Sequence, residues 1–333
     1  MAKRIIEASP EELATLAGRA LLESVRAAGG RTISAEVVAF RSALVDGVSN
    51  AGLAATLGAD IIHLNHYDVD KPMIAGLLST EEGLRVWEKS GLRVAPMHDI
   101  EEPVRRFLSE MGLGVTIRDL RALIGRVVGV SLEVVADGIN APPGRLATPE
   151  TAVRAIEQGA AYITLVATPA ITPETLRANV RRLREGVGPE AVLVTGRMPW
   201  GESRGDVPRF LNGAEIQGLV DAGADVLMLP APGTVPGATV ETVTATVETV
   251  RRLGALAEVT IGTSQESADV ETVRRLALDG KLTGADIYQI GDGGYCGMAI
   301  PENIQAFATA IKGKRHTYRR MASPEGAHLK GGG

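Results

Sequence analysis

Two consecutive copies of one pattern, an apolar strand followed by a glycine-rich loop, constrain the fold more than any other stretch of the chain. The first apolar run, residues 256–261, leads into Gly-Thr-Ser-Gln-Glu at 262–266. The second, residues 285–290, leads into Gly-Asp-Gly-Gly-Tyr-Cys-Gly at 291–297, after a helical pattern at 270–282. Parallel strands need a crossover connection, so strand, helix and strand in succession predict a parallel sheet.

A weak tripeptide repeat indicates that this unit recurs along the chain. Gly-Ala-Asp occurs at 58–60, 223–225 and 284–286, and Gly-Ala-Ala at 159–161, each between a helical pattern and a strand pattern. The glycine can end a helix, and the small alanine fits where a helix packs against a sheet. The repeat therefore predicts regular alternation of helix and strand.

Eight strand patterns can be counted, and each except the second is closely followed by a helical pattern. The 333 residues are 45% hydrophobic and only 3% aromatic, which suits one large barrel with aliphatic strands. We predict an α/β protein, a (β/α)8 TIM barrel, with an N-terminal helix from Ser9 to Gly29. The predicted strands start near Thr32, Ile61, Val127, Tyr162, Ala191, Val226, Ala257 and Ile287.

Residues 66–125 form a long insertion after the second strand, because they exceed the length of a simple connection. We expect this insertion to be a lid or an arm that joins subunits of a homo-oligomer. Residues 1–322 are assigned to a single domain and residues 323–333 to a flexible tail. The closing helix is expected at 301–312, followed by a basic segment at 316–320 that we expect to be solvated. The alternatives are that this segment folds back toward an acidic site or pairs with a neighbouring subunit.

The net charge of −5, with both signs interspersed, gives no case for a nucleic acid or a membrane as partner. No apolar run approaches the roughly 20 residues that cross a bilayer. The single cysteine, Cys296, excludes an intramolecular disulfide and a cysteine-based zinc site, and we expect it to be a small filler. We therefore expect a cytoplasmic protein that binds a small-molecule substrate.

Two carboxylates, Glu36 and Glu133, each stand alone in an apolar strand pattern. A carboxylate that faced the helix layer would be costly, so we predict that both point into one cavity at the barrel mouth. They could hold Mg²⁺ or Mn²⁺, divide acid and base roles, or form structural ion pairs with an interior arginine. We expect replacement of either by glutamine to abolish activity.

The exit of the second strand carries further candidates. His66, with Asn65 and Asp68 beside it, is predicted to be a ligand or base, with a satisfied surface histidine as the alternative. His63 lies three residues earlier, so strand alternation predicts that it faces the opposite side, cannot share a site with His66 and is structural. Arg197, after the fifth strand, is predicted to clamp a carboxylate or phosphate, with packing inside its loop as the alternative.

The loops after the seventh and eighth strands are predicted to bind an anion, because such barrels often bind phosphate there and glycine admits a close ligand. Glu266 and Asp292 add negative charge, so the alternative is that the glycines only make tight turns. The predicted binding residues are Asn65, Gly262, Thr263, Ser264, Gln265, Gly291, Asp292, Gly293 and Gly294.

Two cofactors are not expected. No lysine falls on a predicted strand, so a Schiff base, including one with pyridoxal phosphate, is not predicted. No Gly-x-Gly-x-x-Gly run follows the first strand, so NAD is not predicted either.

Four runs together resemble a family of poorly characterised bacterial barrel proteins that are often labelled phosphoenolpyruvate phosphonomutase-like. They are Asp-Gly-Val-Ser-Asn at 46–50, the proline-rich run at 229–237, Ile-Gly-Thr-Ser-Gln-Glu at 261–266, and His-Thr-Tyr-Arg-Arg-Met at 316–321. The resemblance covers most of the chain and implies the barrel fold. The chain lacks the Lys-x-Cys-Gly-His type of catalytic loop found in phosphonomutases and isocitrate lyases, so the resemblance implies no substrate.

These observations lead to one main hypothesis about function. The chain is expected to be a lyase or isomerase that acts on a small phosphorylated or carboxylated metabolite. A hydrolase that uses the same carboxylates and a non-catalytic regulatory or scaffold barrel are the alternatives.

Overall fold

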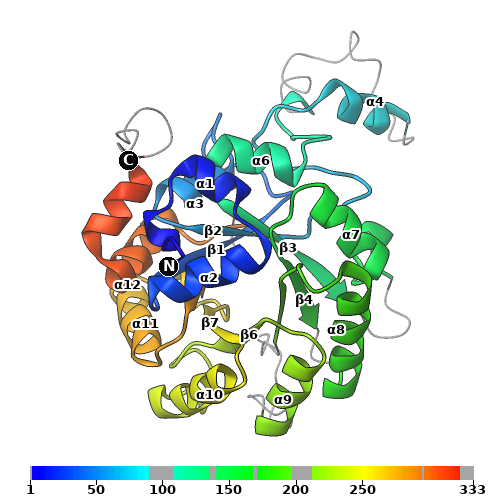
Figure 1. Cartoon of the computed structure of the whole chain (residues 1–333). Helices are drawn as coiled ribbons and strands as arrows, with labels where there is room; N and C mark the ends of the chain where they lie inside the picture. The colour runs from blue at the N-terminus through cyan, green and yellow to red at the C-terminus, as the bar shows by residue number, and fades with distance from the viewer. Residues whose placement is uncertain are drawn as a thin grey trace.

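A computed structural model describes residues 2–89, 108–135, 140–167, 171–196, 212–294 and 296–322. Eight parallel strands form a closed barrel in sequence order, and β8 pairs with β1 (Figure 1). The predicted (β/α)8 barrel is confirmed, and every strand begins within two residues of its predicted start. The strands are β1 Thr32–Val38, β2 Ile61–Asn65, β3 Val127–Val134, β4 Ile163–Ala167, β5 Leu193–Gly196, β6 Val226–Pro230, β7 Leu256–Ile261 and β8 Ile287–Ile290.

Helices surround the barrel and cover the outward face of the strands (Figure 1). Thr148 and Thr172 cap α7 and α8 through their side chains, and each helix begins with proline, as predicted. Outward side chains such as Ile33, Ile62 and Val130 are fully buried beneath the helices. The helices around the barrel are α3 Asn50–Thr56, α6 Ile117–Ile124, α7 Pro149–Glu157, α8 Pro173–Val187, α9 Gly213–Asp221, α10 Val240–Arg252, α11 Val270–Leu282 and α12 Pro301–Met321.

The N-terminal segment is not the single helix that the sequence predicts. It forms η1 (Ile5–Glu7), α1 (Pro10–Thr15) and α2 (Gly18–Ala28). The chain is extended at Leu16 and Ala17, and Gly18 has a φ of 61°, so helical hydrogen bonding stops between α1 and α2. This break lets the apolar side chains of all three elements pack against the inward-facing residues at the N-terminal end of the barrel. The segment thereby closes that end (Figure 1).

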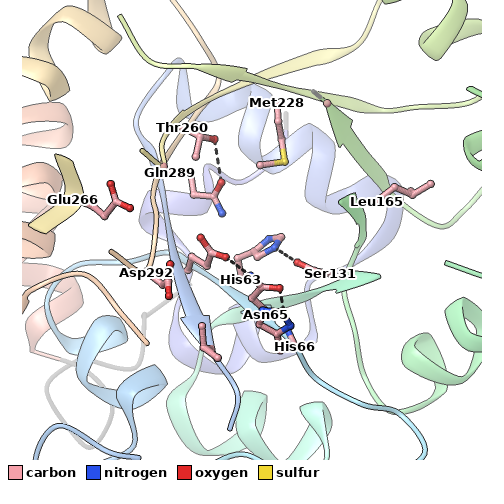
Figure 2. Close-up of a pocket in the computed structure, with 14 residues that line it drawn as sticks. His63, Asn65, His66, Ser131, Leu165, Met228, Thr260, Glu266, Gln289 and Asp292 are labelled. Carbon is pink, nitrogen blue, oxygen red and sulfur yellow. Dashed lines mark hydrogen bonds between the residues drawn. The ribbon is translucent and has the colours of Figure 1, made fainter. Parts of the chain in front are cut away.

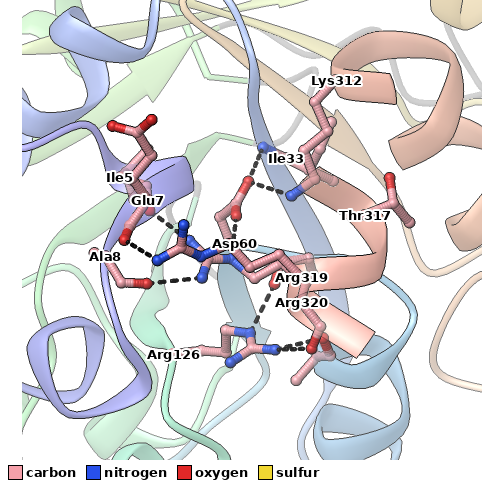
Figure 3. A network of polar contacts seen from close by, with 12 residues as sticks. Ile5, Glu7, Ala8, Ile33, Asp60, Arg126, Lys312, Thr317, Arg319 and Arg320 are labelled. Carbon is pink, nitrogen blue, oxygen red and sulfur yellow. Dashed lines mark hydrogen bonds and ion pairs between the residues drawn. The ribbon is translucent and has the colours of Figure 1, made fainter. Parts of the chain in front are cut away.

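The C-terminal segment also differs from expectation. Helix α12 continues to Met321, with a break at Gly313 where φ is 78°. Arg320 is fully buried and donates from Nε to Asp60 Oδ1 over 2.6 Å and from Nη1 to the Ala8 carbonyl over 2.9 Å (Figure 3). The expectation of a solvated segment at 316–320 is therefore wrong for Thr317 and Arg320, which are buried, although Tyr318 is exposed. The alternative, folding back toward an acidic site, describes Arg320, which pairs with the buried Asp60.

The aspartates of the Gly-Ala-Asp repeat have a common role. Asp60, Asp225 and Asp286 each accept a backbone N–H from the preceding strand at 2.9–3.0 Å, from Ile33, Leu193 and Ala257 respectively. The backbone N–H of each aspartate in turn donates to the carbonyl of the residue whose N–H its carboxylate accepts. Each carboxylate thus ties the start of an even-numbered strand to its neighbour. Gly-Ala-Ala at 159–161 precedes β4 and keeps only a backbone bond, from Ala161 to Val128.

The insertion after β2 lies beside the barrel mouth. Its described part includes α4 (Glu81–Lys89) and leads into α6, and Ala75 donates a backbone hydrogen bond to the Ala39 carbonyl over 2.9 Å. Its role as a lid or as an arm between subunits stays a prediction. None of the helices described combines the length and apolar character needed to span a membrane.

Candidate active site

A cavity of about 220 Å³ opens at the C-terminal ends of the strands, where barrel enzymes carry their active sites (Figure 2). We call it the inner cavity. Strand alternation aims Glu36 of β1, Asn65 of β2 and Thr260 of β7 into it, while their sequence neighbours pack under the helices. Its lining consists of Glu36, Val38, His63, Asn65, His66, Ser131, Leu165, Gly196, Met228, Thr260, Gly262, Glu266, Gln289 and Asp292.

Glu36 points into this cavity, as the sequence predicts. The side-chain amide of Asn65 donates from Nδ2 to Glu36 Oε1 over 2.7 Å, which fixes the carboxylate. Burial, assisted by the negative charge of Asp292, raises the pKa of Glu36 to about 7, although the bond from Asn65 acts in the opposite direction. A carboxyl group with a pKa near neutrality can both accept and give a proton at physiological pH.

Two further glutamates lie close to Glu36. Glu258 lies one interior position below Thr260 on β7, and burial followed by the charge of Glu36 raises its pKa to about 8. Glu266, on the loop after β7, is only 4% exposed, and burial raises its pKa as well. Glu36, Glu258 and Glu266 therefore lie on the β1 and β7 side of the mouth, and Figure 2 shows Glu266 together with Asp292, from the loop after β8, on one side of the cavity.

His63 corrects a sequence prediction. It points into the barrel, where Nε2 lies 2.5 Å from Ser131 Oγ and Nδ1 lies 3.2 Å from the Tyr162 hydroxyl. Burial lowers its pKa to about 4, so the ring is neutral at pH 7. His66 lines the same cavity because it lies beyond the strand end with a φ of 58°, where strand alternation no longer applies. The expectation that the two histidines cannot share a site is therefore wrong.

Glu133 is held away from the inner cavity. It forms an ion pair with Arg145, whose Nε donates to Oε1 over 2.9 Å, and His66 Nδ1 lies 3.3 Å from the same oxygen. Burial acts to raise the pKa of Glu133, but His66 and Arg145 hold it below its ordinary value. We expected both carboxylates to line one cavity, and this holds for Glu36 but not for Glu133. Glu133 instead follows the alternative, because it forms an ion pair with an arginine.

A second, outer cavity of about 470 Å³ adjoins the inner one, and His66 lines both. The insertion after β2, which includes the candidate Asp68, forms much of its wall, and Arg145 also belongs to the lining. Asp68 Oδ1 accepts the backbone N–H of Asp70 over 2.8 Å, which shapes the turn after β2. The apolar part of the wall consists of Phe40, Pro72, Met73, Val86, Leu113 and Pro142.

The residues of the predicted anion site divide into three groups. Gly262 and Asp292, with Asn65, line the inner cavity, and Gly291 lies beside it next to Glu36 and Glu266. The side chains of Thr263 and Gln265 instead donate to the Thr234 carbonyl, over 3.0 and 3.2 Å, and tie their loop to the one after β6. Ser264, Gly293 and Gly294 have φ values of 81°, 70° and 63° and turn the chain. Anion binding stays a prediction.

The remaining site predictions are not tested. Arg197 lies outside the described residues. No group of three or more histidine, cysteine, aspartate or glutamate side chains in the described ranges is arranged to hold a metal ion, and Mg²⁺ or Mn²⁺ stays a prediction.

Sequence reasoning missed several lining residues. Ser131, Thr260 and Gln289 line the cavity, and Glu258 lies beneath it. For Glu258 a signal existed, because it stands alone in an apolar run as Glu36 does. The polar side chains of the other three are common on strands and gave no such signal.

Three solved structures are similar to this chain at low sequence identity. Tryptophan synthase from M. tuberculosis is 13% identical with a TM-score of 0.45, over 89% of this chain and 98% of that chain. An archaeal fructose 1,6-bisphosphate aldolase is 14% identical with a TM-score of 0.47, over 93% and 100%. Pyruvate carboxylase from Rhizobium etli is 10% identical with a TM-score of 0.48, over 94% of this chain and 30% of that chain.

Comparison with curated proteins gives no match. None of these findings supports the phosphoenolpyruvate phosphonomutase-like label that the sequence resemblance suggested. A family model described as a domain of unknown function, DUF7916, matches residues 6–325. Because that match spans nearly the whole chain, the protein belongs to the DUF7916 family.

Proposed function

We propose that the protein is a lyase or isomerase in which Glu36 moves a proton at a carbon atom of a small metabolite. The observation that supports this most is the position of Glu36, enclosed at the barrel mouth, fixed by Asn65 and with a pKa of about 7. A base with this pKa is half ionised near neutral pH and contributes on the order of 100-fold or more to a proton transfer.

A donor for the developing negative charge lies on β8, the strand that pairs with β1, which carries Glu36. Thr260 Oγ1 donates to Gln289 Oε1 over 3.0 Å, which turns the amide so that its NH₂ group faces the cavity (Figure 2). When a proton leaves carbon next to a carbonyl, charge develops on the carbonyl oxygen, and a fixed N–H donor stabilises it. We propose that Gln289 has this role. The carboxylate or phosphate of the substrate would face Arg145 at the rim.

Deuterium exchange can test the proposal before the product is identified. Small metabolites are incubated with the protein in D₂O, and loss of individual C–H signals is followed by proton NMR. We expect exchange into at least one compound, slowed on the order of 100-fold by Glu36→Gln. The exposed variant Glu248→Gln is the matched control. Exchange that continues unchanged in Glu36→Gln would contradict the role of Glu36.

The pH dependence gives an independent prediction. If Glu36 is the base, it must be ionised in the free enzyme, so kcat/KM should rise with pH and level off above about pH 7. The rise follows from the raised pKa, since an ordinary glutamate would be fully ionised well below neutrality. An exchange rate that is flat between pH 5 and 8 would show that no group with a pKa in this range controls the reaction, and would contradict Glu36 as the base.

A hydrolase is the second candidate, because Ser131 Oγ lies 2.5 Å from His63 Nε2, an arrangement of nucleophile and base. The low pKa of His63, about 4, makes the ring a weak base and favours the first proposal. Ser131→Ala separates the two: the hydrolase predicts loss of turnover, whereas proton transfer by Glu36 predicts that deuterium exchange persists.

A further inference from the structure

The inner cavity is rich in carboxyl groups on the side of β1, β7 and β8. Glu36, Glu266 and Asp292 line it, and Glu258 lies beneath. No lysine or arginine belongs to its lining in the part of the chain that the structure describes. A ligand that enters here therefore meets carboxyl groups, and a positively charged donor would lower their pKa values and pair with their ionised forms.

Glu266 shows that one acceptor is not satisfied by the protein. The residue is 4% exposed, and its Oε2 is buried without a hydrogen-bond partner among the described residues. Leaving a buried acceptor unsatisfied costs about 1–3 kcal/mol, and more for a charged group. Figure 2 shows its side chain on the same side of the cavity as Asp292. A ligand with an N–H donor would remove this cost.

Gly291 shows that two of these carboxylates lie near each other. A β-carbon at this position would lie 2.9 Å from the Ile261 carbonyl oxygen, 3.3 Å from Glu266 Oε1 and 3.4 Å from Glu36 Oε2. These two carboxylate oxygens, which belong to different elements, are therefore no more than about 7 Å apart. A small cationic group in the cavity that both side chains line can approach both oxygens.

We infer that the substrate carries an ammonium group, as an amine or amino acid does, and that this group binds to Glu266 and Asp292 beside Glu36. The inference rests on the proposed function, because it places the carbon next to the nitrogen against the base. An ammonium group has three N–H donors and one positive charge, so it can contact several carboxylates. Charge-assisted hydrogen bonds of this kind are about twice as strong as neutral ones.

The outer cavity provides room for an apolar body on the same substrate. The inner cavity, about 220 Å³, is smaller than the roughly 300–1,000 Å³ of typical ligand sites, whereas the outer one measures about 470 Å³. Met73, Val86 and Leu113 contribute apolar wall there. A ligand whose ammonium group is in the inner cavity can pass His66 and place its apolar part between these side chains.

A matched set of three compounds tests the inference. The three compounds share a phenyl group and differ in charge. Phenylalanine carries an ammonium group and a carboxylate, 2-phenylethylamine carries only the ammonium group, and 3-phenylpropanoate carries only the carboxylate. Binding to the full chain is measured by thermal shift and isothermal titration calorimetry. We expect both ammonium compounds to raise the Tm at millimolar concentration and 3-phenylpropanoate to leave it unchanged. A rise with the acid alone, or with none of the three, would overturn the inference.

Variants assign the binding to the named carboxylates. Glu266→Gln should weaken 2-phenylethylamine binding by about tenfold or more, since it removes the paired charge. Asp292→Asn is the second variant. Because Asp292 lies on a partly exposed loop, this variant still tests the assignment if Glu266→Gln misfolds. Binding that both variants leave unchanged would overturn the assignment. A Tm increase with Mg²⁺ or Mn²⁺, together with none from the amines, would replace it with a metal site.

The same measurements separate this inference from the proposed function. Binding does not depend on turnover. One possible result is that the protein binds amines, that Glu266→Gln abolishes this binding, and that no deuterium exchange is detected. This result would support the ammonium site and contradict the enzyme proposal. Exchange that depends on Glu36 in a metabolite without nitrogen, with no amine binding, would do the reverse.

Discussion

Replacing Asp60 with asparagine is expected to lower the free energy of unfolding by about 3–5 kcal/mol, because it leaves buried cations without their counter-charge. Asp60 Oδ2 accepts from Lys312 Nζ over 2.8 Å and Oδ1 accepts from Arg320 Nε over 2.6 Å (Figure 3). The side chains of Asp60 and Lys312 are fully buried, and that of Arg320 is 1% exposed. In the variant Lys312 can shed its proton, since burial already lowers its pKa to about 8, but Arg320 stays charged.

The repeat itself supplies the matched control for this prediction. Asp286→Asn changes the same junction before β8, where Asp286 accepts from the Ala257 N–H and pairs with Arg251. The Arg251 side chain is 46% exposed, so water can replace the carboxylate of Asp286 as its partner. Loss of this ion pair should therefore lower the free energy of unfolding by about 1 kcal/mol or less. Urea unfolding of the two variants should therefore give clearly different midpoints. Equal losses would show that the buried charges around Asp60 contribute little.

Replacing Glu258 with glutamine is expected to stabilise the protein at high pH by about 3–5 kcal/mol. Burial raises the pKa of Glu258 from 4.5 to about 8, and each pKa unit corresponds to about 1.4 kcal/mol between the two protonation states. The folded protein binds this proton more tightly than the unfolded chain does. The contribution to stability is therefore fully present below pH 4.5, declines above it and is lost as the pH rises through 8.

The pH dependence of the difference between the two proteins is the measurement that checks this. Unfolding free energies of wild type and Glu258→Gln should agree within about 1 kcal/mol at pH 4 and diverge by pH 9, with the variant more stable. Exposed Glu248→Gln should show no such divergence. A variant that is less stable than wild type at pH 9 would mean that the ionised carboxylate is stabilised by a partner. The native protein would then retain Glu258 at a cost in stability, which is expected where a carboxyl group beneath Glu36 serves the proposed function.

The sequence by itself determined the barrel, since the information needed was local. Alternating strand and helix patterns fix eight units, and caps such as Thr148 and Thr172 fix helix starts through contacts within three residues. Strand alternation also placed Glu36 inward, because a charged side chain in an apolar strand avoids the helix layer. The break near Gly18 was not predicted, because it serves packing against the barrel base and not any local pattern.

Only the tertiary structure decided which side chains meet. Closure of the barrel brings β8 against β1, and the loops after β7 and β8 then place Asp292 and Glu266 beside Glu36. The same closure carries Arg320 to Asp60, and the loop after β3 brings Arg145 to Glu133. A pKa depends on the burial and charge around a group, and these come from residues far apart in the chain. The sequence could therefore name Glu36 as a candidate, but only the fold raises its pKa toward neutrality.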